Sequence, residues 1–196
     1  MKGQERKIIV DIDNTLWNLA PVLWEYLKGI NPKMPEPSEW DYWDFWERYV
    51  TEKDLYQVLT TIHLKQDEYT PYEESKHFLE ALKERNFYVV IASHREKKTY
   101  AVTERWLKQN GLPFDEIHLS RDKSVLFSDS WGLVDDSPET LDKAARAGII
   151  RAGLSNPWNM NSAHPLFDNL LEVLNYIDSL DGQKTKTNYS NTKEQA

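Results

Sequence analysis

The sequence contains no cysteine among its 196 residues. This absence excludes a disulfide framework, thiol catalysis and thiolate metal sites, and it agrees with a cytoplasmic location. Any metal ion must therefore be held by oxygen or imidazole ligands. Glycine and proline are also scarce, with 7 and 9 residues, as expected for a globular chain rather than a disordered one. The length predicts one domain, with room for an insertion.

Long apolar runs and an excess of basic residues are missing as well. No segment approaches the roughly 18 apolar residues that a membrane-spanning helix needs, and no signal peptide is recognisable, so we expect a soluble protein. The formal charge is −8. Broad contact with nucleic acid requires clustered Lys and Arg, so it is not an expected partner, whereas a small phosphorylated substrate stays possible. The composition leaves the oligomeric state open.

Short apolar segments that end in polar residues alternate with helical patterns along the chain. Strands are expected at 7–10, 87–92, 116–119, 132–134 and 149–154. This alternation predicts an α/β fold with a parallel sheet flanked by helices. We predict three parts: a core of residues 1–16 and 76–181, an insertion over 17–75, and a disordered tail over 182–196, which has almost no apolar content.

The expected insertion has three prolines between 31 and 41 and then becomes strongly aromatic. Thr51 can cap a helix that runs to about Ile62, and another helix is expected to begin at Pro71. Trp43 and Trp46 belong to the aromatic cluster. Their rings could stack on a nucleobase, or they could form the core that such an insertion needs.

Chemically active side chains follow three of the expected strands. Asp11 and Asp13 follow the first strand, Ser93 follows the second, and Asp135 and Asp136 follow the strand at 132–134. Ligands of parallel α/β sheets bind beyond the carboxyl ends of the strands, so these side chains should meet at one edge. The alternative is that Asp11, Asp13 and Ser93 only cap the helices that follow.

The segments Asp11-Ile12-Asp13-Asn14-Thr15, Ser93, Lys123 and Asp135-Asp136 resemble, in order and type, the motifs of the haloacid dehalogenase-like (HAD) phosphatase superfamily. The resemblance implies a Rossmann-like HAD fold with a small helical cap inserted after the first strand. It also implies that Asp11 is the nucleophile, that Asp13 is the general acid and then the base, and that Mg²⁺ is the cofactor. The implied metal ligands are Asp11, the main-chain carbonyl of Asp13, Asp135 and Asp136.

The same resemblance gives roles to the remaining motifs. Ser93 and the amide of His94, expected at a helix start, would bind the phosphoryl oxygens, and Lys123 would help Mg²⁺ to neutralise their charge. An acid at Asp13 requires a raised pKa, which we expect beside other carboxylates. Three other lysines also lie between Ser93 and Asp135, namely Lys97, Lys98 and Lys108.

The run Arg121-Asp122-Lys123 ahead of the acidic pair is similar to that of the 5′(3′)-deoxyribonucleotidase family. This similarity implies a nucleoside monophosphate as substrate, contact of Arg121 with it, and stacking of Trp43 or Trp46 on the base. Asn14-Thr15 stands where that family has Gly-Val, and the spacing from Lys123 to Asp135 is two residues longer. The alternatives are another small phosphate ester, a phosphoprotein, or a non-catalytic phosphate-binding module.

The five histidines show no metal-ligand spacing. His63 in particular is interpreted as an ordinary surface or core residue, and no zinc site is expected.

Overall fold

The computed structural model describes residues 6–191, with side chains described through residue 180. Six parallel strands form one sheet in the order β3-β2-β1-β4-β5-β6. Their bounds are β1 Arg6–Val10, β2 Phe87–Ser93, β3 Glu116–Leu119, β4 Ser130–Val134, β5 Ile150–Leu154 and β6 Leu166–Phe167. The predicted α/β fold with a parallel sheet is confirmed, and β6 is a short edge strand that the sequence analysis missed.

Strand β1 lies inside the sheet, and its alternating side chains join two cores. Ile8 and Val10 pack into the larger core, with residues of α3 (Ser75–Glu84), α4 (Tyr100–Gln109) and α6 (Leu170–Asn191). Ile9 packs into the smaller core, with residues of α5 (Pro138–Arg146) and of the 3₁₀ segment η5 (Lys123–Asp129). Both faces of the sheet are therefore covered, which explains the nearly unbroken apolar sequence of these strands.

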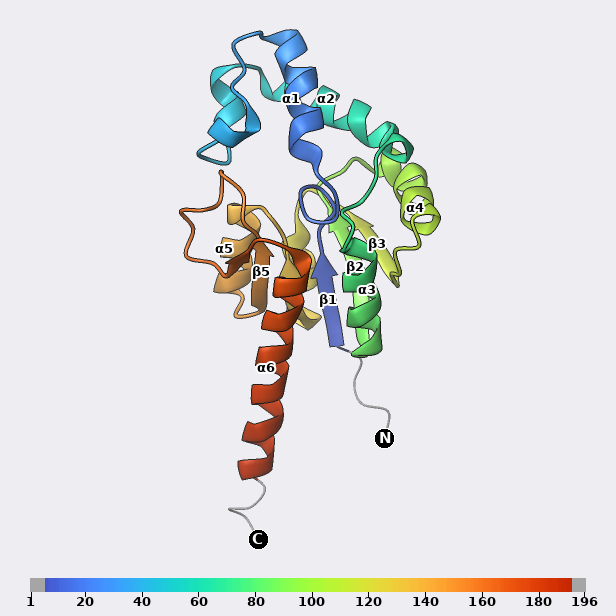
Figure 1. The fold of residues 1–196 in the computed structure, drawn as a ribbon, viewed down its shortest axis with the longest axis vertical. Helices are drawn as coiled ribbons and strands as arrows, with labels where there is room; N and C mark the ends of the chain where they lie inside the picture. Colours follow the sequence, from blue (N-terminus) through green and yellow to red (C-terminus); the bar gives the residue numbers. More distant parts are fainter. Residues whose placement is uncertain (1–5, 192–196) are drawn as a thin grey trace.

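The predicted insertion contains two α-helices, α1 (Leu19–Ile30) and α2 (Glu52–Leu64), and three 3₁₀ turns, η1 (Pro37–Glu39), η2 (Phe45–Arg48) and η3 (Gln66–Glu68). Helices α1 and α2 lie above the carboxyl ends of the strands (Figure 1). Thr51 caps α2, since its side chain accepts from the amide of Asp54 at 3.2 Å, as predicted. The insertion therefore covers the edge of the sheet where the sequence analysis places the site.

The chain returns from the insertion to the core beside Leu16. The carbonyl of Leu16 accepts from the amide of Tyr72 at 2.9 Å and from the Ser75 hydroxyl at 2.8 Å. Helix α3 begins only at Ser75, four residues later than the predicted start at Pro71. The connecting residues are used in this crossing between the two parts, and so they are not available to a helix.

Aromatic residues of the insertion pack into the larger core. Trp40 is 1% exposed, and its ring stacks on Phe45 with centroids 3.8 Å apart. The ring centroid of Trp158, from the segment after β5, lies 5.9 Å from that of Trp40. Trp43 and Trp46 are partly buried against the same core. This region of the aromatic cluster joins the insertion to the core domain.

The ends of two helices test the boundaries that the sequence predicts. Helix α4 ends at Gln109, and Gly111 has a φ of +62°, the left-handed conformation expected after a helix. Helix α6 continues to Asn191, so residues 182–191 of the predicted disordered tail lie in this helix. Residues 192–196 of that tail lie outside the described part. None of the described helices is long and apolar enough to span a membrane.

Candidate active site

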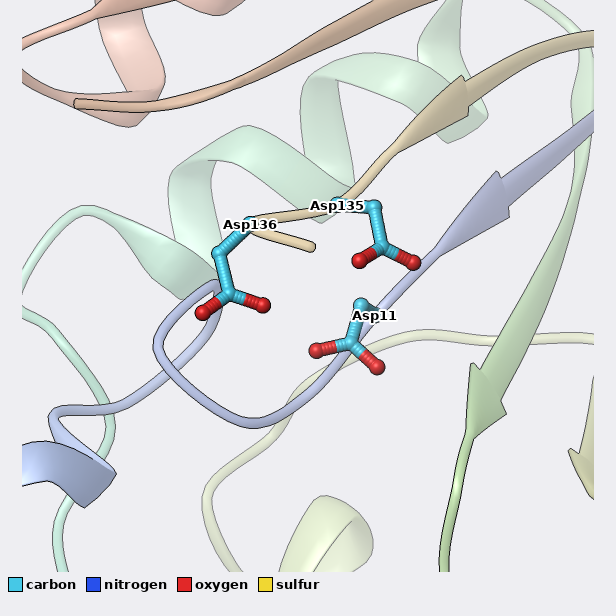
Figure 2. A group of neighbouring side chains, drawn as sticks. All are labelled: Asp11, Asp135 and Asp136. Carbon is cyan, nitrogen blue, oxygen red and sulfur yellow. The ribbon is translucent and has the colours of Figure 1, made fainter. Parts of the chain in front are cut away.

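Three buried carboxylates meet at the carboxyl edge of the sheet. Asp11 follows β1, while Asp135 and Asp136 follow the neighbouring strand β4, and the pairing of Val10 with Val134 brings the two strand ends together. Figure 2 shows the three side chains close together at the ends of the two strands. Oxygen atoms from all three lie within 4.8 Å of one another. Such a set of hard oxygen donors could hold a divalent metal ion.

Lys123 supplies the positive charge inside this cluster. Its Nζ lies 2.5 Å from Oδ1 of Asp11 and 2.7 Å from Oδ2 of Asp135, and the residue is 3% exposed. Lys98 and Lys108, two of the other lysines in this part of the sequence, form exposed ion pairs with Glu96 and Glu104. The structure therefore places Lys123 in the cluster and these two lysines on the surface.

The electrostatics of the cluster favour an added cation. Burial raises the pKa of Asp11 to about 7 against the attraction of Lys123, and the charges of Asp135 and Asp13 act in the same direction as burial. Burial, with Asp11 and Asp135 adding to it, also raises the pKa of Asp136 well above its usual range. One ammonium group is too little charge for three ionised carboxylates. A divalent cation fits this donor set, because it would supply the missing positive charge.

Asp13 is bound by a different set of groups. Its Oδ1 accepts from Nη2 of Arg95 at 2.6 Å and from the Trp17 indole at 2.9 Å. Its Oδ2 accepts from Nε of Arg95 at 3.1 Å and from the Ser93 hydroxyl at 3.2 Å. Nε2 of His63 lies 3.2 Å from the same Oδ2. The carboxylate thus has five polar contacts, from four residues.

These neighbours overturn the expected pKa of Asp13. Burial opposes ionisation of this carboxyl, but the guanidinium of Arg95, followed by His63, outweighs burial and holds the pKa well below its usual range. Burial also lowers the pKa of His63, so Arg95 is the charge that persists at neutral pH. The prediction of a raised pKa was wrong because it considered the neighbouring carboxylates and not the buried arginine two residues after Ser93.

Ser93 and His94 differ in their surroundings. Ser93 ends β2, is 1% exposed, and donates to Asp13. His94 is not at a helix start, since a 3₁₀ turn begins only at Lys97 and α4 at Tyr100. That expectation was wrong because the intervening chain is extended, with Glu96 at φ −68° and ψ 144°. An anion at this place would therefore meet loop amides rather than a helix terminus.

A cavity of about 250 Å³ lies between α2 and the loops that follow β2 and β3. Its lining includes His94, Arg95, Arg121 and, from α2, Tyr56. The guanidinium of Arg121 lies 4.5 Å from the centre of the Tyr56 ring. A second hollow of about 670 Å³, also lined by Tyr56 and Arg121, continues along α2. Tyr56 is thus an aromatic side chain at the cavity that the sequence analysis did not select.

The conformation of Asn14 explains why asparagine can stand where the similar deoxyribonucleotidase motif has glycine. Its φ is +54°, a left-handed conformation that glycine and asparagine adopt more readily than other residues. Its side-chain Nδ2 donates to Oδ2 of Asp136 at 3.2 Å, and its side-chain Oδ1 accepts from the main-chain amide of Ala20 at 2.9 Å. Asparagine at this position therefore keeps the turn that glycine would allow and adds contacts to the acidic pair and to α1.

Gly153 lets β5 approach the acidic loop closely. A Cβ atom at this position would lie 2.2 Å from the main-chain oxygen of Asp135. The backbone of Asp135 is also held by its amide, which donates to the carbonyl of Ala152 at 3.1 Å. Oδ1 of Asp135 accepts from the amide of Ser137 at 2.9 Å, which fixes the side chain. The position of this carboxylate is therefore determined by packing on several sides.

The sequence analysis missed three residues at this place: Arg95 and His63, which contact Asp13, and Gln66, which contacts Arg95. Arg95 had a usable signal, because an arginine next to a buried strand end requires an acidic partner. His63 and Gln66 lie on α2 and η3 of the insertion, and their approach to Asp13 and Arg95 depends on how the insertion is placed. No local pattern reports that placement.

A sequence profile of the family described as 5′ nucleotidase, deoxy (pyrimidine), cytosolic type C protein matches residues 6–171. The chain belongs to this family. Membership of the 5′ nucleotidase family, together with the HAD-like fold, makes the protein a phosphoric monoester hydrolase. The resemblance noted from the motifs is thereby confirmed at the level of the family. No curated protein matches the chain.

Solved structures of HAD-like hydrolases share the fold of this 5′ nucleotidase family member. A protein from Haemophilus somnus 129pt, described as a predicted phosphoglycolate phosphatase, superposes with a TM-score of 0.62 at 19% identity, over 90% of this chain and 100% of its own. A putative beta-phosphoglucomutase from Thermotoga maritima gives 0.59 at 14% identity, over 89% and 99%. The HAD-like family protein SP0104 from Streptococcus pneumoniae gives 0.59 at 14%, over 88% and 98%. At these identities the likeness shows the fold alone.

Proposed function

We propose that the protein is a magnesium-dependent phosphatase that releases phosphate from nucleoside or deoxynucleoside monophosphates through an aspartyl-phosphate on Asp11. The observation that carries the proposal is the position of Asp11: its carboxylate lies at the carboxyl edge of the sheet, 2.5 Å from Lys123 and beside two further buried acids. Family membership supports a phosphate ester of a nucleoside as the substrate.

In the first step, the carboxylate of Asp11 attacks phosphorus, and the bond from phosphorus to the ester oxygen breaks. Asp13 gives a proton to the departing oxygen, so a neutral alcohol leaves. Lys123 offsets part of the phosphoryl charge, which otherwise repels an anionic nucleophile. Asp11, Asp135 and Asp136 would hold Mg²⁺, which when bound supplies the remaining neutralisation and orients the phosphoryl group.

In the second step, water attacks the phosphoryl group on Asp11, and Asp13 accepts a proton from that water. The bond between phosphorus and Asp11 breaks, so inorganic phosphate forms and the nucleophile is regenerated. The low pKa of Asp13 keeps this carboxyl ionised before substrate binds, so it is free to accept a proton, but the same low pKa makes it a weak base. In the first step, the dianionic substrate adds negative charge beside Asp13, which raises the pKa of that carboxyl and favours the acid form.

The cavity beside His94 and Arg121 is a suitable place for the leaving alcohol, because it lies between the core loops and the insertion. Tyr56 offers a ring at its wall, partly paired with Arg121. Contact of the substrate with Trp43 and Trp46 stays a prediction, and their packing against the larger core favours the structural alternative given above.

A panel of phosphate monoesters tests the proposal. With Mg²⁺ present, deoxynucleoside and nucleoside monophosphates should be hydrolysed with higher kcat/KM than sugar phosphates or phosphopeptides, and chelation should abolish turnover. Asp11→Asn should release no phosphate and retain no acid-stable label from ³²P-labelled substrate, while the exposed Asp41→Asn control stays active. Sugar phosphates performing as well as nucleotides would defeat the substrate assignment, and turnover by Asp11→Asn would defeat the nucleophile.

A further inference from the structure

Arg95 is an unusual residue to find in this position, because its side chain is completely buried. A buried guanidinium is unfavourable unless acceptors surround it. Arg95 meets Asp13 with a two-pronged contact, from Nη2 to Oδ1 at 2.6 Å and from Nε to Oδ2 at 3.1 Å. A two-pronged contact fixes both the position and the plane of the carboxylate, whereas a lysine would fix only a distance.

The guanidinium is itself held by residues from two other parts of the chain. Nη1 donates to the hydroxyl of Thr103, on α4, at 3.1 Å. Nη2 also donates to Oε1 of Gln66 at 2.9 Å, and Gln66, in η3 of the insertion, is fully buried. The fork that Arg95 presents to Asp13 is therefore oriented by the core on one side and by the insertion on the other.

The insertion also contacts Asp13 directly. Nε2 of His63, on α2, lies 3.2 Å from Oδ2 of Asp13, and the residue is 4% exposed. Two residues of the insertion thus complete a shell around the Asp13–Arg95 pair of the core, because His63 contacts Asp13 and Gln66 contacts Arg95. A purely structural ion pair between the two parts would not need to end on a carboxylate two residues after Asp11.

We infer that Arg95 is the positioning residue for Asp13 and that the insertion completes this hold through Gln66 and His63. The inference rests on the proposed function, in which Asp13 transfers protons to and from the ester oxygen and water. The Asp13 carboxylate is held in the position for proton transfer only when the insertion lies on the core. The contact between insertion and core that closes the cavity therefore also positions this acid. Proton transfer is sensitive to such placement, since an error of about 1 Å can reduce a rate by about 10².

Leaving groups of different basicity provide the test. An alkyl phosphate needs a proton on its departing oxygen, whereas 4-nitrophenyl phosphate expels a stable phenolate without one. In the magnesium-loaded enzyme, Arg95→Lys should lower kcat for the alkyl ester by about 10² and kcat for the aryl ester by about fivefold or less, with little change in KM. Equal losses on both esters would overturn the inference, because they would indicate a structural role.

The insertion side gives independent variants that leave Arg95 in place. Gln66→Met and His63→Gln should each reduce kcat selectively for the alkyl ester, by roughly 10-fold, since each removes one member of the shell. The matched control is Arg105→Lys: Arg105, on α4, pairs with Asp67 of η3 at the surface and so also joins core to insertion without touching Asp13. A similar selective loss in Arg105→Lys would overturn the inference, because it would show that any weakened contact between insertion and core has this effect.

The double variant Asp13→Asn with Arg95→Lys gives a further check. If Arg95 acts through Asp13, the double variant should be no slower on the alkyl ester than Asp13→Asn alone. Independent losses that multiply would refute the inference. Failure of the proposed function has a different signature, because the wild type would then hydrolyse neither ester and the role of Arg95 would fall with it. A wild type active on both, without a selective loss in Arg95→Lys, refutes the inference alone.

Discussion

Asp11→Asn should stabilise the metal-free protein at pH 8 and have little such effect at pH 4. The pKa of Asp11 is raised from 3.8 to about 7, mainly by burial. Between these two values the folded protein binds more protons than the unfolded chain, so the stability of the wild type falls as pH rises through this window. Each pKa unit corresponds to about 1.4 kcal/mol, and roughly three units give about 4 kcal/mol. The side-chain amide of the Asp11→Asn variant carries no charge, so its burial does not incur this pH-dependent loss of stability.

The measurement is urea unfolding in the presence of a chelator, followed by fluorescence of the eight tryptophans, from pH 4 to pH 8. The difference in free energy of unfolding between Asp11→Asn and wild type should shift in favour of the variant by about 4 kcal/mol across the series. Asp41→Asn, at an exposed position, should show no shift. A difference that stays constant with pH, or a variant less stable than wild type at pH 8, would refute the argument from burial.

Magnesium should narrow the stability difference between Asp11→Asn and wild type at pH 8. A ligand that binds only the folded protein stabilises it by about 2.7 kcal/mol at 100 times its Kd, and the wild type keeps the full set of three carboxylates. The gain on adding Mg²⁺ should therefore be larger for wild type than for Asp11→Asn. Equal gains in the two proteins would show that Asp11 is not a ligand.

Two further substitutions test the support of the cluster. Lys123→Met removes the cation that contacts Asp11 and Asp135, and it should lower the free energy of unfolding of the metal-free protein by about 3–5 kcal/mol at pH 8. The loss should be smaller at pH 5, where Asp11 is protonated. Urea titrations at the two pH values check this prediction, and an equal loss at both would contradict it. Gly153→Ala places a Cβ against the carbonyl of Asp135 and should lower the free energy of unfolding by about 1–3 kcal/mol. It should also weaken Mg²⁺ binding, measured by calorimetry. An unchanged affinity for Mg²⁺ would show that β5 can shift away from Asp135.

The core of the fold could be predicted from the sequence because its signals are local. Apolar segments ending in polar residues predicted β1 and β4, and the Thr51 cap and the Asn110-Gly111 pair predicted helix ends that the structure shows. The start of α3 was wrong because residues before Ser75 contact Leu16, which is distant in the sequence. The short strand β6 has only two residues, which is too short for a periodic pattern.

The site could be predicted only in part, for the same reason. Asp11, Lys123, Asp135 and Asp136 were selected from motifs at strand ends, and the structure brings all four together. The low pKa of Asp13 was not predicted, since it depends on Arg95, whose place after a buried strand end was not taken into account. Tyr56, His63 and Gln66 come from the insertion, whose placement on the core is a tertiary property.

The central place of β1 has a consequence for how the chain acquires its structure during synthesis. The strand that leads into Asp11 is synthesised before both of its partners, which are residues 87–91 on one side and 130–134 on the other. Contacts between residues so far apart in sequence form slowly, because a long loop must close before they yield any stabilisation. The apolar segment Ile8–Val10 therefore lacks both neighbouring strands until residue 91 has been synthesised, and it lacks the second one until residue 134 has been synthesised. This interval is when the nascent protein depends most on protection from aggregation.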